Sequence, residues 1–215
     1  MFLLNYLDQS RSPLIWLLLQ YLFGGVVDKR KLYASAYTNE TELLEVGCSV
    51  GNTSAAFTGF PGISFTGIDI DPSAIAFAKR NFKKHANFRF LHTSLEALAE
   101  TGEKFDLILF AGVCHHVDNP TLAQMLKAAV KCLKPHSKLV VIDPLLPVKE
   151  DGGFVNFFMK HFEKGRHLRS HEDLLSALAH VNGLKIAGHA ATMIGATPLS
   201  WPKCSRFGTY TLSNS

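Results

Sequence analysis

The chain is poor in cysteine, in charged residues and in long apolar runs. Its cysteines are scattered and form no Cys-x-x-Cys pair, so the sequence predicts neither a zinc site nor a disulfide framework. We therefore expect no metal, and we expect a reduced, cytoplasmic setting. The four cysteines are Cys48, Cys114, Cys132 and Cys204. For Cys48 and Cys114, which fall at predicted strand ends, packing is a better explanation than nucleophilic chemistry.

No apolar run reaches the ~20 residues that a membrane-spanning helix needs. The longest run, residues 13–27, is interrupted by Gln20. Asp8 and Arg11 precede it and no small-residue cleavage site follows, so we do not expect a signal peptide. We interpret residues 1–40 as a helical segment whose apolar helix docks on the domain as part of a substrate cover. A peripheral membrane contact through residues 13–27 is the alternative.

The charge balance is mild. Charged residues make up 19% of the chain and the formal net charge is +4. Nucleic-acid-binding proteins usually carry a basic stripe, and no long basic run is present, so no nucleic-acid partner is expected. The length of 215 residues fits one domain with a substantial core.

From residue 42 the sequence alternates predicted strands and helices, which is typical of a parallel α/β sheet. The aromatic-rich segment 145–170 predicts a helical lid, because a structureless loop of that length is unusual in a compact domain. A helix from Ser170 to about Val181 and a closing antiparallel pair follow. Strands are expected at 42–47, 64–69, 88–92, 106–111, 138–143, 184–191 and 206–213, and helices near 52–59, 73–85, 94–100 and 120–133.

A glycine-bearing turn follows the first predicted strand, which ends with the acid Glu45. Gly47 permits a sharp turn and a close approach of backbone to a ligand, and Gly51 lets the next helix pack near the strand. Asp69 ends the second strand about 20 residues later, the offset at which an acid reaches ribose hydroxyls. A carboxylate accepts hydroxyl hydrogen bonds but repels a phosphate. The pattern therefore indicates a ligand with an unphosphorylated, adenosine-type ribose.

Four segments resemble, in order, the motifs of class I methyltransferases that depend on S-adenosylmethionine (SAM). Residues 45–51 resemble the first motif, acid-x-Gly-x-Gly-x-Gly, and residues 67–72 the second-strand motif. Residues 105–117 and 133–144 resemble the fourth strand and the approach to the fifth. The resemblance implies SAM as cofactor, S-adenosylhomocysteine as product, and a methyltransferase domain over residues 41–215. It implies a cofactor site formed by Glu45, Gly47, Cys48, Ser49, Gly51, Asp69, Ile70, Ser94, Leu95 and Ala111.

The resemblance also implies the fold. We expect a three-layer α/β sandwich with a mostly parallel, seven-stranded sheet in the order 3-2-1-4-5-7-6 and an antiparallel last strand. Two residues depart from the family pattern: Ser49 replaces the middle glycine of the first motif, and Ser94 stands where many members carry an Asp that contacts the adenine amino group. A hydroxyl accepts that hydrogen bond more weakly than a carboxylate.

His115 and His116, directly after the fourth strand, are the candidate catalytic residues. For a hydroxyl acceptor, a His with a pKa near neutrality is a suitable general base; a capping or packing role is the alternative. His116 matches a recurrent family His that more often shapes the site than takes a proton. Asp143 ends the fifth strand and faces either the acceptor or solvent. A basic group in the predicted lid either grips an acidic acceptor or is solvated; it comprises His161, Arg166, His167, Arg169 and His171.

We expect a SAM-dependent methyltransferase acting on a small, partly hydrophobic molecule. No Ser-His-Asp set is visible, and none is needed for a methyl group already activated by a sulfonium. A non-catalytic SAM-binding regulatory module, favoured by Ser49 and Ser94, is one alternative. A protein or RNA methyltransferase is another, although residues 111–114 lack the Asp/Asn-Pro-Pro-aromatic run of base methylases. An NAD dehydrogenase is disfavoured, since the glycine spacing departs from G-x-G-x-x-G.

Overall fold

The computed structural model describes residues 12–163 and 165–214 of the chain. Within these residues seven strands are present. They are β1 (Glu42–Val46), β2 (Ser64–Asp69), β3 (Phe88–His92), β4 (Phe105–Ala111), β5 (Leu133–Pro144), β6 (Lys185–Gly195) and β7 (Lys203–Ser213). All the predicted strands are present, and β5 and both C-terminal strands are longer than expected.

The α-helices lie between the strands and before the first one. They are α1 (Pro13–Phe23), α2 (Val26–Ala34), α3 (Pro72–Asn81), α4 (Leu95–Ala99), α5 (Asn119–Cys132), α6 (Gly152–Phe162) and α7 (His171–Ala179). Short 3₁₀ helices are η2 (Ser54–Phe57), η3 (Cys114–His116) and η4 (Lys149–Asp151). Side chains cap four of the helices at their N-termini and thereby fix where these helices begin; the caps are Asp71, Ser94, Asp118 and Ser170.

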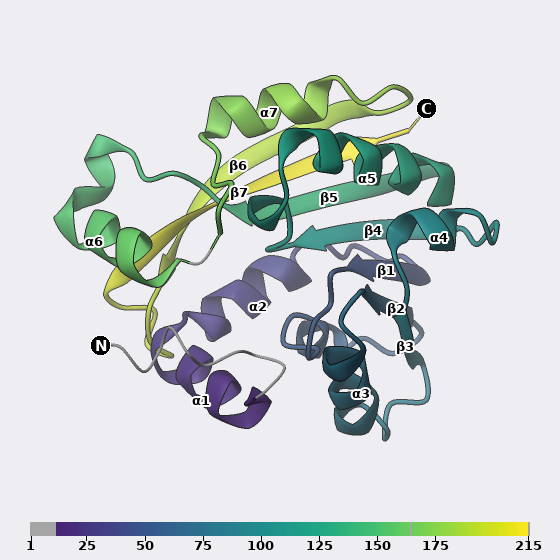
Figure 1. Cartoon of the computed structure of the whole chain (residues 1–215), viewed down its shortest axis with the longest axis horizontal. Coiled ribbons are helices and arrows are strands. Elements are labelled where there is room, and N and C mark those ends of the chain that lie inside the picture. Colours follow the sequence, from purple (N-terminus) through teal and green to yellow (C-terminus); the bar gives the residue numbers. More distant parts are fainter. Residues whose placement is uncertain (1–11, 164, 215) are drawn as a thin grey trace.

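The strands form one sheet in the order β3-β2-β1-β4-β5-β7-β6 (Figure 1). Strands β1 to β5 pair in parallel, and β7 runs antiparallel to both of its neighbours. Helices α4, α5 and α7 cover one face, and α2 and α3 cover the other. The predicted three-layer α/β fold and its strand order are confirmed.

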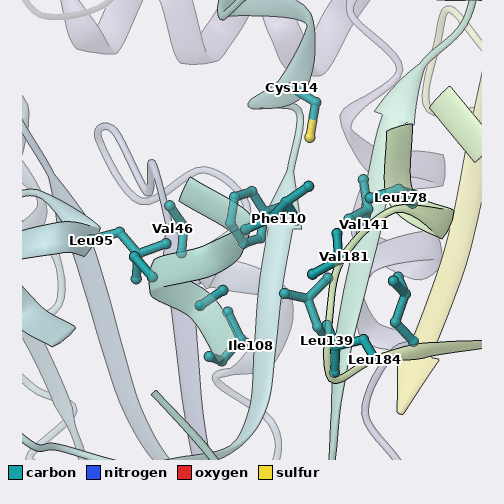
Figure 2. Close-up of a cluster of buried hydrophobic side chains, with 14 of the residues drawn as sticks. Val46, Leu95, Ile108, Phe110, Cys114, Leu139, Val141, Leu178, Val181 and Leu184 are labelled. Atoms are coloured by element: carbon teal, nitrogen blue, oxygen red, sulfur yellow. The ribbon is translucent and has the colours of Figure 1, made fainter. Parts of the chain in front are cut away.

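The core lies on both faces of the sheet because successive strand residues point to opposite sides. Leu43 and Leu107 belong to the cluster under α2 and α3, whereas Leu44 and Ile108 belong to the cluster under α4, α5 and α7. All four side chains are fully buried. Figure 2 shows part of the second cluster, in which side chains of β1, β4 and β5 pack with those of α4 and α7.

One expectation about helices is wrong. The helix expected near 52–59 is only the short η2, because Gly59, Pro61 and Gly62 follow at once and stop it. The N-terminal apolar helix, α1, contacts α2 but buries none of its own residues completely, whereas α2 buries Val26 and Tyr33. That this segment covers a substrate stays a prediction. In the described part of the chain, no helix has the length and apolar character required to cross a bilayer.

Parallel strands end at the same edge of the sheet. The turns after β1, β2, β4 and β5 therefore meet, and these are the turns that carry the predicted site.

Candidate functional site

The turn after β1 has a backbone conformation that suits glycine. Gly47, Ser49 and Gly51 have φ angles of 70°, 48° and 83°. A Cβ atom at Gly47 would lie 2.6 Å from a methyl group of Val113, and one at Gly51 would lie 2.5 Å from the ring of Phe82. Any side chain at either position would be strained and too close to its neighbour. The turn therefore needs both motif glycines.

Ser49 adopts the left-handed conformation without being glycine, which costs about 1–2 kcal/mol. Its N–H donates to Asp69 Oδ2 at 2.8 Å. Its Oγ is buried and has no hydrogen-bond partner among the described residues. A buried hydroxyl without a partner requires an explanation, and a polar ligand bound at this turn would supply one.

Asp69 lies at the end of β2 with its carboxylate fixed by two backbone groups. Ser49 N–H donates to Oδ2 and Asp71 N–H donates to Oδ1, at 2.8 and 2.9 Å. A carboxylate offers about four lone-pair positions, so about two remain for further donors. A ribose diol supplies two hydroxyl donors.

Glu45 is buried at the end of β1, with 1% of its surface exposed. Burial raises its pKa to about 8, although hydrogen bonds from Ser54 and Thr53 act in the opposite direction. The Ser54 hydroxyl donates to Glu45 Oε2. At neutral pH the carboxyl group is therefore mostly protonated, and a cation bound nearby would favour its ionised form.

A second polar cluster forms where β4 and β5 end. Gly112, with a φ of 69°, turns the chain out of β4 into η3. There His115 Nδ1 lies 3.2 Å from both carboxylate oxygens of Asp143, the strand-end acid of β5. Cys114 N–H also donates to Asp143 Oδ1 at 3.0 Å. The predicted histidine and Asp143 thus form a buried pair, with 6% and 2% exposed.

The chain after α6 closes over the other side of the His115 ring. His115 Nε2 lies 3.4 Å from Glu163 Oε1, and Gly165 N–H donates to the same oxygen at 3.0 Å. His167 N–H donates to the His115 carbonyl at 3.0 Å. Burial acts to lower the pKa of His115, but the Asp143 carboxylate, followed by Glu163, outweighs it, so the pKa is raised.

Tyr33, from α2, connects the two clusters. It is buried, and its hydroxyl would lie 3.8 Å from a Cβ atom built on Gly112. Burial raises its pKa, and the nearby charges of Asp143, Glu45 and Glu163 raise it further. Tyr33 is therefore a neutral phenol beside acids from both clusters.

The His116 ring lies against the His115 ring, with centroids 3.9 Å apart and planes tilted by 42°. Partial burial lowers the pKa of His116, and the neighbouring His115 lowers it further. The two imidazoles thus have pKa values shifted in opposite directions, with His115 the better proton acceptor.

Arg169 neither grips an acceptor nor lies in solvent. It is buried, and its guanidinium donates to the carbonyls of Cys114, His167 and Val117 and to Asn119 Oδ1. Both interpretations of the basic group are therefore wrong for Arg169. Its guanidinium hydrogen bonds fix η3 and the residues that follow it.

Known proteins share both the sequence pattern and the fold. The model of a methyltransferase-domain family matches residues 43–136. The chain is 30% identical over 109 residues to a demethylmenaquinone methyltransferase of Chlorobaculum tepidum, a match covering 50% of this chain and 43% of that protein. The chain therefore spans less than half the length of this curated relative.

Two solved structures show the fold. Mitomycin 7-O-methyltransferase MmcR aligns with a TM-score of 0.67 and 20% identity over 88% of this chain and 54% of MmcR. N-methyltransferase NodS from Bradyrhizobium japonicum WM9, in complex with S-adenosyl-L-homocysteine, aligns with a TM-score of 0.61 and 18% identity over 87% of this chain and 85% of NodS.

Residues 43–136 match a methyltransferase-domain family, and the chain has the fold of class I SAM-dependent methyltransferases. SAM is the cofactor of this family, and the residues after β1 and β2 fit it. The free lone pairs of Asp69 suit the ribose, the unsatisfied Ser49 hydroxyl suits a polar group, and the open Gly47 turn admits backbone contact.

The methyltransferase fold brings the predicted cofactor residues to one edge, but in different environments. Cys48 and Leu95 are 2% exposed and Ala111 is 7% exposed, whereas Ile70 is 76% exposed. Ser94 Oγ accepts a hydrogen bond from Ala97 N–H as the N-cap of α4. Contacts of these side chains with the cofactor remain predictions.

Sequence reasoning missed two residues of this site. Tyr33 has no local motif, since it lies near the end of a helix before the first strand. Glu163 had a usable signal, because it is an acid directly after the aromatic α6 in the predicted lid.

Replacing Ser49 with glycine should raise the free energy of unfolding by about 0.5–1 kcal/mol, because it relieves the left-handed strain at a smaller entropic cost. Urea denaturation measures this. Ser176→Gly, inside α7, is the matched control and should lower stability by roughly 0.5 kcal/mol. A less stable Ser49→Gly protein would contradict the strain assigned to this position.

Proposed function

We propose that this chain transfers the methyl group of SAM to a hydroxyl of a small, partly hydrophobic acceptor, with His115 as the proton acceptor. The observation that carries the proposal is the buried His115–Asp143 pair beside the turns that fit SAM. SAM supplies a methyl group on a sulfonium, so the protein need only orient the acceptor, exclude water and receive a proton.

Asp143 prepares His115 for that task. Because a carboxylate only accepts hydrogen bonds, Nδ1 must carry the hydrogen that faces Asp143, and the neutral ring then keeps its lone pair on Nε2. The carboxylate also stabilises the ring after Nε2 has taken a proton. Glu163, 3.4 Å from Nε2, gives the new N–H an acceptor.

Burial supports an acceptor with apolar surface. His115 is almost closed off from solvent, and the walls near it include Tyr33 and Val113. The similar proteins are named for different acceptors, so the particular molecule has to be found by assay. Purified protein with labelled SAM and a panel of hydroxylated aromatic and aliphatic compounds is the direct test.

A non-catalytic SAM-binding module is the second candidate, and Ser49 and Ser94 favour it because both depart from the family pattern. Titration calorimetry separates the two functions. A module would bind SAM and S-adenosylhomocysteine without ever transferring label to any member of the panel.

Asp69→Asn should weaken SAM binding by about 10–100-fold, because hydrogen bonds to a charged group contribute about 1.5–3 kcal/mol. Calorimetric titration with SAM measures the loss. Asp118→Asn, which removes a charge at the N-cap of α5 but keeps an oxygen for the Thr121 N–H, is the control and should leave the SAM Kd unchanged. Equal affinities of Asp69→Asn and the unaltered protein would remove Asp69 from the cofactor site.

Binding of the SAM cation should release protons near pH 7, because it favours ionisation of Glu45, whose pKa is about 8. Calorimetry in two buffers with different protonation enthalpies counts the protons. Glu45→Gln should abolish the release. Glu40→Gln should not change it, because hydrogen bonds from Lys138 and Thr38 outweigh burial and lower the Glu40 pKa to about 2.

The rate of transfer should rise with pH through the raised pKa of His115, above the ordinary His value of about 6.5. Below that pKa Nε2 is protonated and cannot accept; above it the neutral form dominates. In Asp143→Asn the carboxylate is gone and burial lowers the pKa, so this limb of the kcat profile should shift to lower pH while kcat falls by about 10²–10⁴. His180→Gln, an exposed substitution at the end of α7, should leave the profile intact. If the pH dependence of kcat is the same in Asp143→Asn as in the unaltered protein, a group other than His115 accepts the proton.

A further inference from the structure

Nearly all the exposed large apolar side chains of the described residues lie in three segments. Helix α1 contributes several, with Leu14 72% and Leu18 56% exposed. Residues 146–162, which include α6, contribute Phe154 and Phe157, each 48% exposed. The turn 196–202 contributes Leu199 and Trp201, 88% and 74% exposed. We call these three segments the apolar face; among the described residues, only Ile70 lies elsewhere.

Hydrogen bonds and ion pairs hold the three segments together. Gly25 N–H, between α1 and α2, donates to the Ala196 carbonyl at 2.8 Å. Asp28 of α2 accepts from Gly195 N–H at 2.9 Å and from the Ser200 hydroxyl. In Figure 1 the turn between β6 and β7 lies between α1 and α6.

Helix α6 is fixed to the same hairpin. Arg206 of β7 forms a two-pronged ion pair with Asp151, the residue before α6, and α6 packs against β7. The apolar face is therefore a defined surface made by α1, the turn between β6 and β7 and the segment after β5.

The charge around this face indicates whether its partner is an anionic surface or a second copy of the chain. Residues 12–34, 146–162 and 195–206 contain seven Lys or Arg residues and three acids, Asp28, Glu150 and Asp151. Asp151 is paired with Arg206. Asp28 is already engaged by the turn and lies 3.6 Å from Lys203 Nζ. The remaining charge is positive, which complements an anionic surface. A second copy of the chain would bring the same positive charge against itself.

The apolar segments have the size and composition of an interfacial contact. Helix α1 has 11 residues and no charged side chain, and at ~1.5 Å per residue it covers about 16 Å. That is too short to cross the ~30 Å hydrocarbon core but suits a helix lying in the headgroup region. Tyr21 and Trp201 are of the type that prefers this interface.

We propose that the apolar face docks on the surface of an anionic lipid bilayer. Leucine and aromatic side chains of α1, α6 and the 196–202 turn enter the boundary between headgroups and acyl chains, and the basic side chains meet the headgroups. The consequence for substrate class, an acceptor that partitions into the bilayer, rests on the proposed function; the docking itself does not.

Sedimentation of the full chain with vesicles tests the docking. The probes are phosphatidylcholine vesicles with and without phosphatidylglycerol, at low and high salt. We expect binding to the anionic vesicles that weakens as salt is raised. Leu14→Ser combined with Leu199→Ser should lose tenfold or more in affinity, while Phe77→Ser, a half-buried apolar control on α3, should bind like the unaltered protein.

Charge reversal supplies the second arm. Lys31→Glu, on α2, should weaken binding to anionic vesicles roughly fivefold or more, and Lys79→Glu, on α3, should not. SAM calorimetry without vesicles shows that each variant is folded. Because it is a separate measurement from vesicle binding, an error in the proposed function would appear there and not in the vesicle experiment. Absence of vesicle binding would overturn the proposal. So would a concentration-dependent dimer that the leucine variant dissociates without any lipid dependence, since the occupant would then be a second copy.

Discussion

Two strand-end carboxylates fix the turns of the neighbouring strands, and the site depends on this constraint. Asp69 at the end of β2 binds the N–H of Ser49 in the turn after β1, and Asp143 at the end of β5 binds the N–H of Cys114 in the turn after β4. A hydrogen bond to a charged group contributes about 1.5–3 kcal/mol. Each acid therefore shapes a turn on the adjacent strand and keeps lone pairs for a second partner.

That second partner differs between the two acids. Asp69 has lone pairs left to accept hydrogen bonds from the ribose of SAM, whereas Asp143 accepts a hydrogen bond from His115. One arrangement, an acid at a strand end bonded to the next turn, thus underlies both the proposed cofactor site on β1 and β2 and the proposed proton acceptor on β4 and β5. Tyr33 of α2 lies near the acids of both groups.

The N-terminal helices and the turn between β6 and β7 meet on one side of the fold. Asp28, near the N-terminus, holds the turn between the last two strands through Gly195 and Ser200. This contact places an uncovered apolar helix beside an uncovered apolar turn, and Arg206 brings α6 alongside. The apolar face is thus a product of tertiary contacts, and its three segments are far apart in the sequence.

Local patterns in the sequence determined the elements and the first half of the site. The alternation of apolar strands and helices predicted the parallel sheet. Two glycines after the first strand and an acid at the end of the second predicted the cofactor-binding turn. Both patterns can be read from the sequence because each depends on residues that are close together in the chain. The pairing of charged and polar side chains, in contrast, depends on the tertiary structure. The pairing of His115 with Asp143 and Glu163, the burial of Arg169 against carbonyls and the position of Tyr33 join segments remote in the chain, and no local spacing encodes such contacts. The same reason applies to α1: an apolar sequence shows that a helix requires a cover, and only the assembled fold shows that the described residues leave several of its side chains exposed.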